Sequence, residues 1–143
     1  MPPDAISRFA RYFEQLQPAD IARLGQYYAA DARFKDPFND VRGVPAIARI
    51  FSHMFESLDQ PRFVVTQQLQ QGSDAFLSWD FTFRFKNFRR GELQRIEGAT
   101  HLKLDDAGLV TLHRDYWDAA EELYEKLPLV GGLMRWLKAR ANA

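Results

Sequence analysis

Apolar residues near the start of the chain recur at the three- and four-residue spacing of helices that bury one face. The first predicted helix follows Asp4, a residue type that caps helices, and ends before Pro18. A second, shorter helix is expected from Asp20 to about Ala30. The apolar positions of these two helices are Ile6, Phe9, Ala10, Phe13 and Leu16, followed by Ile21, Leu24, Tyr27 and Tyr28.

The next segment predicts a short strand, a turn-rich loop and a third helix. Residues 32–37 form the expected strand, and residues 38–43 supply the Asn, Asp and Gly typical of turns. Pro45 suits the first turn of a helix, which Pro61 closes. The apolar stripe of this helix comprises Ile47, Ile50, Phe51, Met54, Phe55 and Leu58.

After Pro61 the period changes to two, which predicts four strands separated by turns at residues 72–74, 88–91 and 105–108. Short turns of this kind favour antiparallel neighbours. The clearest strand is Phe76 to Phe85, and a further strand is expected from Val110 to Trp117. One face of the clearest strand is almost entirely aromatic and consists of Leu77, Trp79, Phe81, Phe83 and Phe85.

Helices followed by a run of strands predict an α+β domain, with three N-terminal helices packed on one face of a curved antiparallel sheet. The 143 residues contain no repeat and no linker, so we expect a single domain over residues 1–143. Residues 119–143 are expected to form a C-terminal helical extension, interrupted around Pro128.

Composition narrows the classes of function. The 19 Lys and Arg balance the 19 Asp and Glu, so there is no surplus of positive charge to attract nucleic acid. The absence of cysteine excludes disulfides, thiolate metal sites and cysteine nucleophiles. Three scattered histidines do not have the spacing of a zinc site, so no metal is expected. Without a signal sequence or a long apolar run, a cytoplasmic location is the expectation.

The aromatic content is high, at 14% of the residues, with 12 Phe, 5 Tyr and 3 Trp. These side chains either fill the core or line a cavity for a flat, apolar ligand.

The order of elements, together with Ala29-Ala30-Asp31-Ala32, Phe34-Lys35-Asp36-Pro37 and Val41-Arg42-Gly43 before a helix, resembles the nuclear transport factor 2-like (NTF2-like) superfamily. The resemblance covers nearly the whole chain and points to the SnoaL-like and ketosteroid isomerase-like branch. It implies a cone-shaped fold with a pocket, and it implies dimerisation through the sheet. The superfamily includes enzymes and non-catalytic association domains, so the fold alone does not imply a reaction.

Two positions are similar to functional residues of ketosteroid isomerase. Asp36, before Pro37, stands where that enzyme has its proton-moving base, and Tyr12 stands where a tyrosine donates to the oxyanion. Thr100 falls at the position where ketosteroid isomerase has a carboxylic acid. In that enzyme, an apolar site keeps the acid protonated, so that it can donate a hydrogen bond.

The last predicted strand is similar to the end of limonene epoxide hydrolase, where an aspartate activates water. Asp115 stands at that place. If Asp115 faces the pocket, alternation brings His113 and Trp117 to the same face, and Asp36 is expected across from them. The predicted catalytic residues are therefore Asp36, Asp115, His113 and Tyr12.

Each candidate also has a structural interpretation. Asp36 could cap a turn, Asp115 could be a buried structural carboxylate, His113 could be a core histidine, and Tyr12 could be a packing residue. The predicted substrate-binding residues are Trp79, Phe81, Phe83, Thr100, Trp117, Phe51 and Phe55.

Two functions from different classes remain open. The first is a small-molecule binding protein or enzyme that moves a proton on an apolar cyclic substrate without a cofactor, by isomerisation, cyclisation, dehydration or hydration. The second is a non-catalytic ligand carrier or a dimeric association module, in which two subunits pair through the outer sheet face. That face is expected to carry Ser78, Asp80, Thr82, Arg84, Arg95, Glu97 and His101.

The basic amphipathic run over residues 129–143 has two interpretations. It could cover the mouth of the cone as a lid or join two subunits, and it could instead lie on a membrane surface. The lid is favoured, because Leu127, Leu129, Val130 and Leu133 would need cover in any case.

Overall fold

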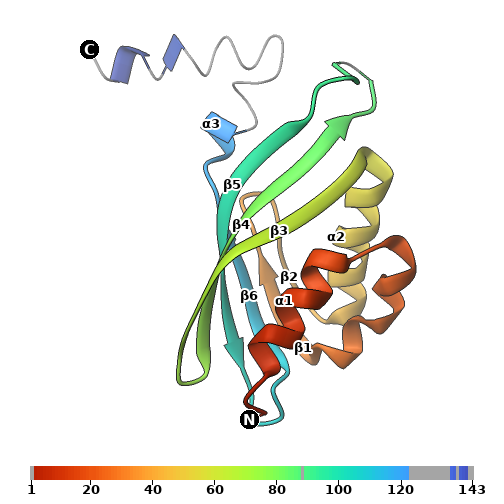
Figure 1. Ribbon diagram of the computed structural model, residues 1–143, viewed down its shortest axis with the longest axis vertical. Helices are drawn as coiled ribbons and strands as arrows, with labels where there is room; N and C mark the ends of the chain where they lie inside the picture. The colour runs from red at the N-terminus through yellow and green to blue at the C-terminus, as the bar shows by residue number, and fades with distance from the viewer. Residues whose placement is uncertain (1, 88, 123–135, 138, 142–143) are drawn as a thin grey trace.

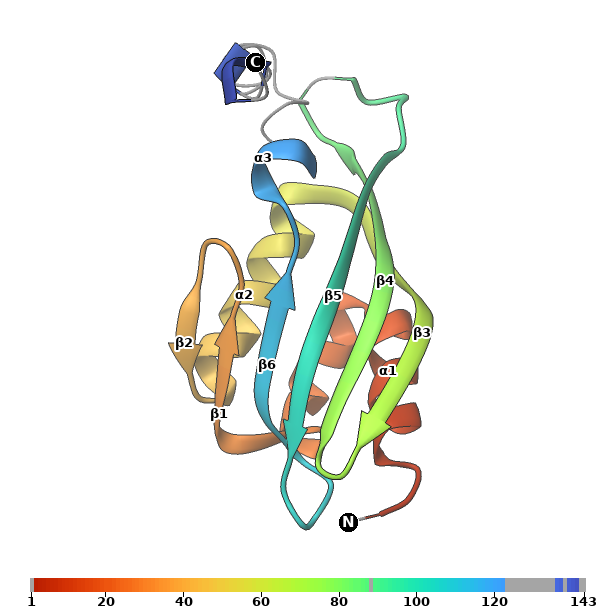
Figure 2. The same cartoon turned by 90° about the vertical axis from the view of Figure 1, so that its left-hand side faces the viewer.

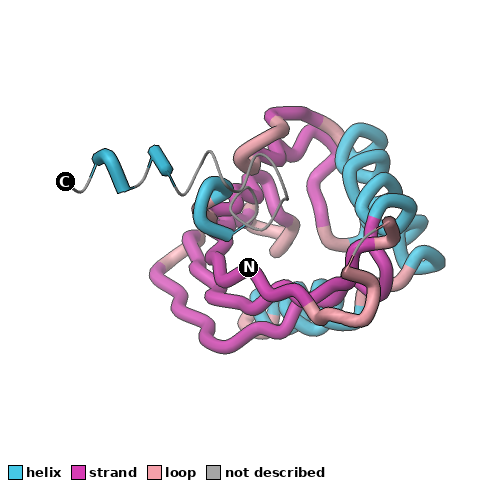
Figure 3. Tube along the Cα trace, turned by 90° about the horizontal axis from the view of Figure 1, so that it is seen from above, coloured by secondary structure: helices cyan, strands magenta, loops and turns pink. Residues whose placement is uncertain are grey.

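A six-stranded sheet curls around two α-helices and a 3-10 helix in the computed structural model, which describes residues 2–87, 89–122, 136–137 and 139–141 (Figure 1). The elements in chain order are α1 (Ala5–Gln15), η1 (Pro18–Gln26), β1 (Tyr28–Lys35), β2 (Asp40–Arg42), α2 (Val44–Ser57), β3 (Leu58–Gln71), β4 (Asp74–Phe85), β5 (Gln94–Leu104), β6 (Val110–Tyr116) and α3 (Ala119–Glu122). The helices α1, η1 and α2 lie on the concave side of the sheet, as the view from above shows (Figure 3). This confirms an α+β fold with a curved sheet.

The first predicted helix is confirmed, and the third is confirmed at its start but not at its end, because α2 ends at Ser57 and β3 already begins at Leu58. α1 buries the expected stripe, and α2 begins with Pro45 in its first turn. Asp4 precedes α1 but makes no capping hydrogen bond with its side chain.

The second predicted helix is wrong in type and in length. Residues 18–26 form the 3-10 helix η1, and the chain enters β1 at Tyr28, so three α-helices do not precede the sheet. The helical spacing of Tyr27 and Tyr28 is overridden by strand pairing, because Tyr28 lies opposite Val110 of β6 and is buried in the core.

The sheet is mixed, so the prediction of a purely antiparallel sheet is also wrong. Its order is β2-β1-β6-β5-β4-β3, and β6 pairs with β1 in parallel (Figure 2). β6 therefore lies between the strands that come first and fifth in the chain. Alternation along one strand fixes which residues face inward but does not identify the neighbouring strand.

The long strands β3 to β6 form the antiparallel meander that the alternating pattern predicts. The inward face of β4 is buried over Leu77, Trp79, Phe81 and Phe83. Trp79 lies opposite Gly98 of β5, and the indole covers the position where a side chain on Gly98 would project. The glycine thus makes room for the tryptophan ring.

The predicted C-terminal extension and its possible role as a lid or membrane contact fall largely outside the described residues. Within the described ranges, none of the helices has both the length and the apolar composition that a bilayer-spanning helix needs.

Candidate functional site

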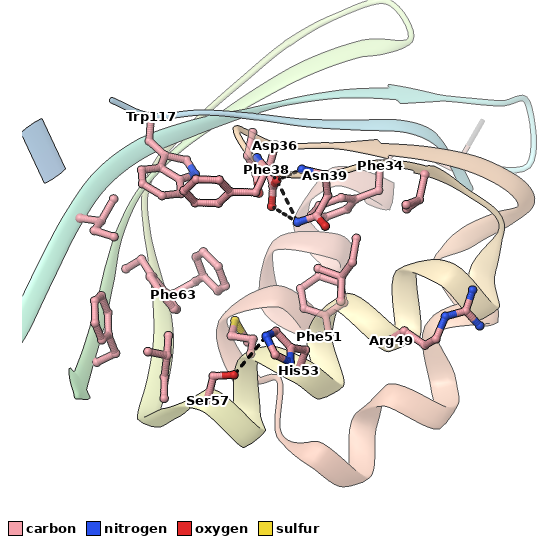
Figure 4. A pocket seen from close by; sticks show the side chains of 18 of the residues that line it. Phe34, Asp36, Phe38, Asn39, Arg49, Phe51, His53, Ser57, Phe63 and Trp117 are labelled. Carbon is pink, nitrogen blue, oxygen red and sulfur yellow. Dashed lines mark hydrogen bonds between the residues drawn. The ribbon is translucent and has the colours of Figure 1, made fainter. Parts of the chain in front are cut away.

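A cavity of about 630 Å³ lies between α2 and the concave face of the sheet. Apolar and aromatic side chains form most of its wall, and a small number of polar side chains interrupt them (Figure 4). This size and composition are typical of sites for small apolar molecules. The apolar lining consists of Phe34, Phe38, Val41, Ala46, Ile50, Phe51, Met54, Leu58, Phe63, Trp79, Phe81, Phe83, Ile96 and Trp117.

Asp115 lines this cavity at the centre of a chain of hydrogen bonds. Its Oδ1 accepts from Thr100 Oγ1 at 2.6 Å and lies 2.7 Å from Nε2 of His113. Trp79 Nε1 donates to Thr100 Oγ1 at 2.8 Å, and the Tyr28 hydroxyl lies 2.7 Å from Nδ1 of His113. Oδ2 of Asp115 accepts no hydrogen bond from the part of the chain that the structure describes. One carboxylate oxygen is therefore fixed, and the other is available to a ligand.

The surroundings of His113 select one arrangement of protons. Burial, followed by the nearby Asp115, raises the pKa of the Tyr28 phenol well above its usual value of 10. The protonated phenol can then donate to Nδ1, which leaves the imidazole proton on Nε2, facing the carboxylate. His113 is fully buried and does not line the cavity, so it orients Asp115 from behind.

The rings of four aromatic residues enclose the imidazole of His113. Phe34 lies 4.5 Å from it between centroids, and Phe13, Phe9 and Tyr28 lie 5.7 to 5.9 Å away. Because α1 supplies Phe9 and Phe13, the first helix fixes the position of the residue that holds Asp115.

Asp36 also lines the cavity, but its carboxylate is occupied by its own loop. Oδ1 accepts from the backbone N–H groups of Phe38 and Asn39, and the amide of Asn39 donates to both carboxylate oxygens. This is the turn-capping arrangement that the sequence left open as an alternative. β1 runs beside β6 with Lys35 opposite Arg114, so Asp36 comes from the strand next to Asp115 and not from the far wall.

Tyr12 lies outside the cavity, away from the other candidates. Its hydroxyl donates to the backbone carbonyl of Asp20 at 2.6 Å, and its ring stacks on Tyr27. The structure therefore does not bring this phenol to the carboxylates Asp36 and Asp115, because α1 directs it toward η1.

Most of the predicted substrate-binding residues line the cavity. Trp79, Phe81, Phe83, Trp117 and Phe51 are among them. Two others are not part of the wall. Phe55 is partly buried against the core, and Thr100 is fully buried behind Asp115.

Sequence reasoning missed the polar groups that α2 contributes. His53 and Ser57 line the cavity, with His53 Nε2 3.3 Å from the Ser57 hydroxyl, and Arg49 lies one turn earlier. The Asp36–Asn39 group and the His53–Ser57 pair lie on different sides of the cavity (Figure 4). The four-residue spacing from Arg49 to His53 and Ser57 was the available signal, because it places them on one helix face.

The structure offers no metal centre within the described ranges. No group of three or more His, Cys, Asp or Glu side chains comes together there. The chemistry available from the described residues is hydrogen bonding and proton transfer by a carboxylate in an apolar wall.

Comparison with known proteins yields one family match. A model of the SnoaL-like domain matches residues 9–113. No curated protein sequence is significantly similar to the chain.

Solved structures share the fold at low sequence identity. A protein from Catenulispora acidiphila DSM 44928 with a ketosteroid isomerase-like fold, in complex with trimethylamine, is 18% identical with a TM-score of 0.71, covering 86% of this chain and 92% of that chain. A putative SnoaL-like polyketide cyclase from Shewanella putrefaciens CN-32 is 21% identical with a TM-score of 0.68, covering 86% of this chain and 98% of that chain. An LEH-like epoxide hydrolase from M. tuberculosis is 15% identical with a TM-score of 0.66, covering 94% of this chain and 89% of that chain.

Proposed function

We propose a function from the premise that the chain belongs to the SnoaL-like domain family of the NTF2-like superfamily. The protein is a cofactor-independent enzyme that transfers a proton on an apolar cyclic substrate, with Asp115 as its base. The observation that carries this proposal is the Asp115 carboxylate, which lines an apolar cavity with Oδ1 bound twice and Oδ2 unbound within the described chain. Among the predicted catalytic residues, it is the carboxylate whose geometry suits this role best.

The proposed step begins with an activated C–H bond, or a water molecule, near Oδ2 of Asp115. The carboxylate takes the proton and becomes a carboxylic acid. When the proton comes from a C–H bond, the remaining electron pair moves toward an oxygen of the substrate. When it comes from water, the hydroxide oxygen bonds to a substrate carbon while a C–O bond of that carbon breaks and leaves its electron pair on oxygen. Return of the same proton to another carbon or to an oxygen completes an isomerisation or an addition, so no oxidant is needed. His113 and Thr100 hold Oδ1 in place throughout, which keeps Oδ2 aimed at the substrate.

The cavity wall supports an apolar, flat substrate that carries at least one oxygen. The aromatic rings of Trp79, Phe81 and Phe63 supply apolar contact area that a flat ring of the substrate can pack against. His53 and Ser57 offer hydrogen bonds on the α2 side to an oxygen at the end of the substrate away from Asp115. The epoxide hydrolase and polyketide cyclase neighbours, which share the fold, agree with oxygen-bearing apolar substrates.

The test is exchange of carbon-bound protons in heavy water. A panel of cyclic ketones and hydroxyquinones is incubated with the protein, and deuterium incorporation is followed by mass spectrometry while binding is followed by calorimetry. The unsubstituted protein should accelerate exchange for the compounds that bind. Asp115→Asn, which keeps the shape of the side chain, should lower the rate by at least about a hundredfold and retain binding.

Asp36→Asn is the matched comparison, because it removes the neighbouring carboxylate from the same cavity. It weakens the turn, so we expect a lower melting temperature with the exchange rate within about threefold of the original. Equal loss of exchange in both variants would contradict the assignment to Asp115. Binding without any exchange in the unsubstituted protein would favour a ligand carrier.

A dimeric association module is the second candidate function, and the outer face of the sheet supports it. Leu69, Phe76 and Tyr116 are 68, 47 and 47% exposed on strands β3, β4 and β6, beside charged residues of both signs. We propose that two copies pair through this face. Sedimentation should give a dimer for the unsubstituted protein and a monomer for Phe76→Glu. The control is Leu93→Glu, at an exposed residue immediately before β5. A monomer at every concentration would contradict this pairing.

A further inference from the structure

A second depression of about 150 Å³ lies between α1 and η1, outside the cavity of Asp115. We call it the arginine pocket, because three of its lining side chains are arginines. It is lined by Arg8, Arg11, Tyr12, Gln15, Asp20, Arg23 and Tyr27. None of these residues lines the larger cavity, so the arginine pocket is a separate feature of the surface.

Two of the arginines each lie against the ring of a tyrosine. The Arg8 guanidinium lies 5.3 Å from the centre of the Tyr27 ring, and Tyr27 stacks on Tyr12 at 4.0 Å. The Arg23 guanidinium lies 5.6 Å from the centre of the Tyr12 ring. Stacking on aromatic faces restricts these long side chains and lowers the entropy that binding would otherwise cost.

The positive charge of the three arginines is not balanced by the other residues that line the arginine pocket. Asp20 is its carboxylate, and both oxygens are already engaged, Oδ1 by Arg23 Nη2 at 2.8 Å and Oδ2 by the backbone N–H of Gln17 at 2.9 Å. Arg8 and Arg11 form no ion pair with any carboxylate of the described chain. Three positive charges against one negative charge leave two positive charges in a concave site.

Glu14, three residues after Arg11 on α1, is directed toward β3 and does not line the arginine pocket. Its Oε2 accepts a hydrogen bond from the backbone N–H of Val65 on β3, at 3.0 Å. The unbalanced charge therefore remains available to a ligand.

We propose that the arginine pocket binds a phosphate group, as the dianion of a phosphate monoester. A doubly negative oxyanion matches the uncompensated charge, and guanidinium groups bind phosphate oxygens through paired N–H donors. Arg8 and Arg11, one turn apart on α1, approach from one side, and Arg23 approaches from η1. The volume admits one phosphate group and leaves the rest of the ligand outside. This proposal does not depend on the function proposed for Asp115.

The experiment is calorimetric titration of the full chain with inorganic phosphate at constant ionic strength, with sodium chloride as the balancing salt. We expect saturable binding of one phosphate per chain. Arg8→Gln and Arg11→Gln should each weaken binding at least about tenfold, because each removes a charge-assisted hydrogen-bond donor. Arg62→Gln, an exposed arginine of β3, removes the same charge elsewhere and should leave the affinity unchanged.

Two outcomes would overturn the proposal. One is an equal loss of affinity in Arg62→Gln and Arg11→Gln, since binding would then follow net charge alone. The other is equal affinity for acetate and for methyl phosphate, since the arginine pocket would then not select a dianion. Asp115→Asn should bind phosphate as the unsubstituted protein does, which separates this result from the test of proton transfer.

Discussion

Gly98 offers a direct test of how the hydrogen-bond chain behind Asp115 is packed. A Cβ atom added to this residue would overlap the Trp79 indole, meeting Cη2 at a contact distance that real side chains do not adopt, and lying 2.8 Å from both Cζ2 and Cζ3. These atoms belong to a ring that is 3% exposed and donates to Thr100. Gly98→Ala must therefore displace Trp79 or bend β5.

The expected cost can be estimated from three contributions. Forcing an extra methyl group into a packed core costs about 1–3 kcal/mol. Loss of the hydrogen bond from Trp79 to Thr100 adds about 1 kcal/mol, and the lower backbone freedom of alanine in the unfolded chain returns about 0.5–1 kcal/mol. The net destabilisation of Gly98→Ala is about 1–3.5 kcal/mol, or roughly 3–12 °C in melting temperature for a chain of this size.

The assay is thermal unfolding followed by circular dichroism, with tryptophan fluorescence as a second readout of ring displacement. Gly25→Ala is the control, because a Cβ there meets no atom within 4 Å. Its melting temperature should stay the same or rise slightly. If Gly98→Ala has the same melting temperature as Gly25→Ala and its tryptophan fluorescence is unchanged, the close packing of Trp79 on β5 is refuted.

Three further predictions concern the same core. Tyr28→Phe leaves Nδ1 of buried His113 without its partner, so chemical denaturation should show a loss of about 1–3 kcal/mol; no loss would contradict the hydrogen bond. Burial raises the pKa of Tyr12 to about 12, so the unfolded state ionises first and stability should fall as pH rises from 10 through about 12. Denaturation at several pH values should show a shallower fall in Tyr12→Phe, and an unchanged slope would refute this origin. Phe63→Ala removes a ring stacked 4.0 Å from Phe13 and should cost about 3–5 kcal/mol by thermal unfolding, whereas a loss under 1 kcal/mol would show that the wall collapses.

Much of the fold was predictable because it depends on local periodicity. β4 and β5 alternate between a buried and an exposed face, so their inward residues followed directly from the sequence. The position of β1 did not follow, because Tyr27 and Tyr28 also fit a helix. Only pairing with β6, more than 80 residues later in the chain, decides between the two, and this pairing has no local signal.

The candidate site was predictable to the same degree. Alternation along β6 placed His113, Asp115 and Trp117 on one face, and the structure brings all three to the concave side. Tyr28 was not predicted as the partner of His113, because its strand neighbour was unknown. Tyr12 was misplaced because spacing along a helix does not show which neighbouring element the side chain faces.

The location of β6 in the middle of the sheet also determines when the site can form during synthesis. β1 and β5 are made first, yet neither has its full set of hydrogen-bonded neighbours until β6 is added between them. Their open edges are then able to pair with other chains, and sheets closed by such distant contacts fold slowly. Asp115 lies on this closing strand, so a nascent chain cannot hold the proposed base in place before its sheet is complete.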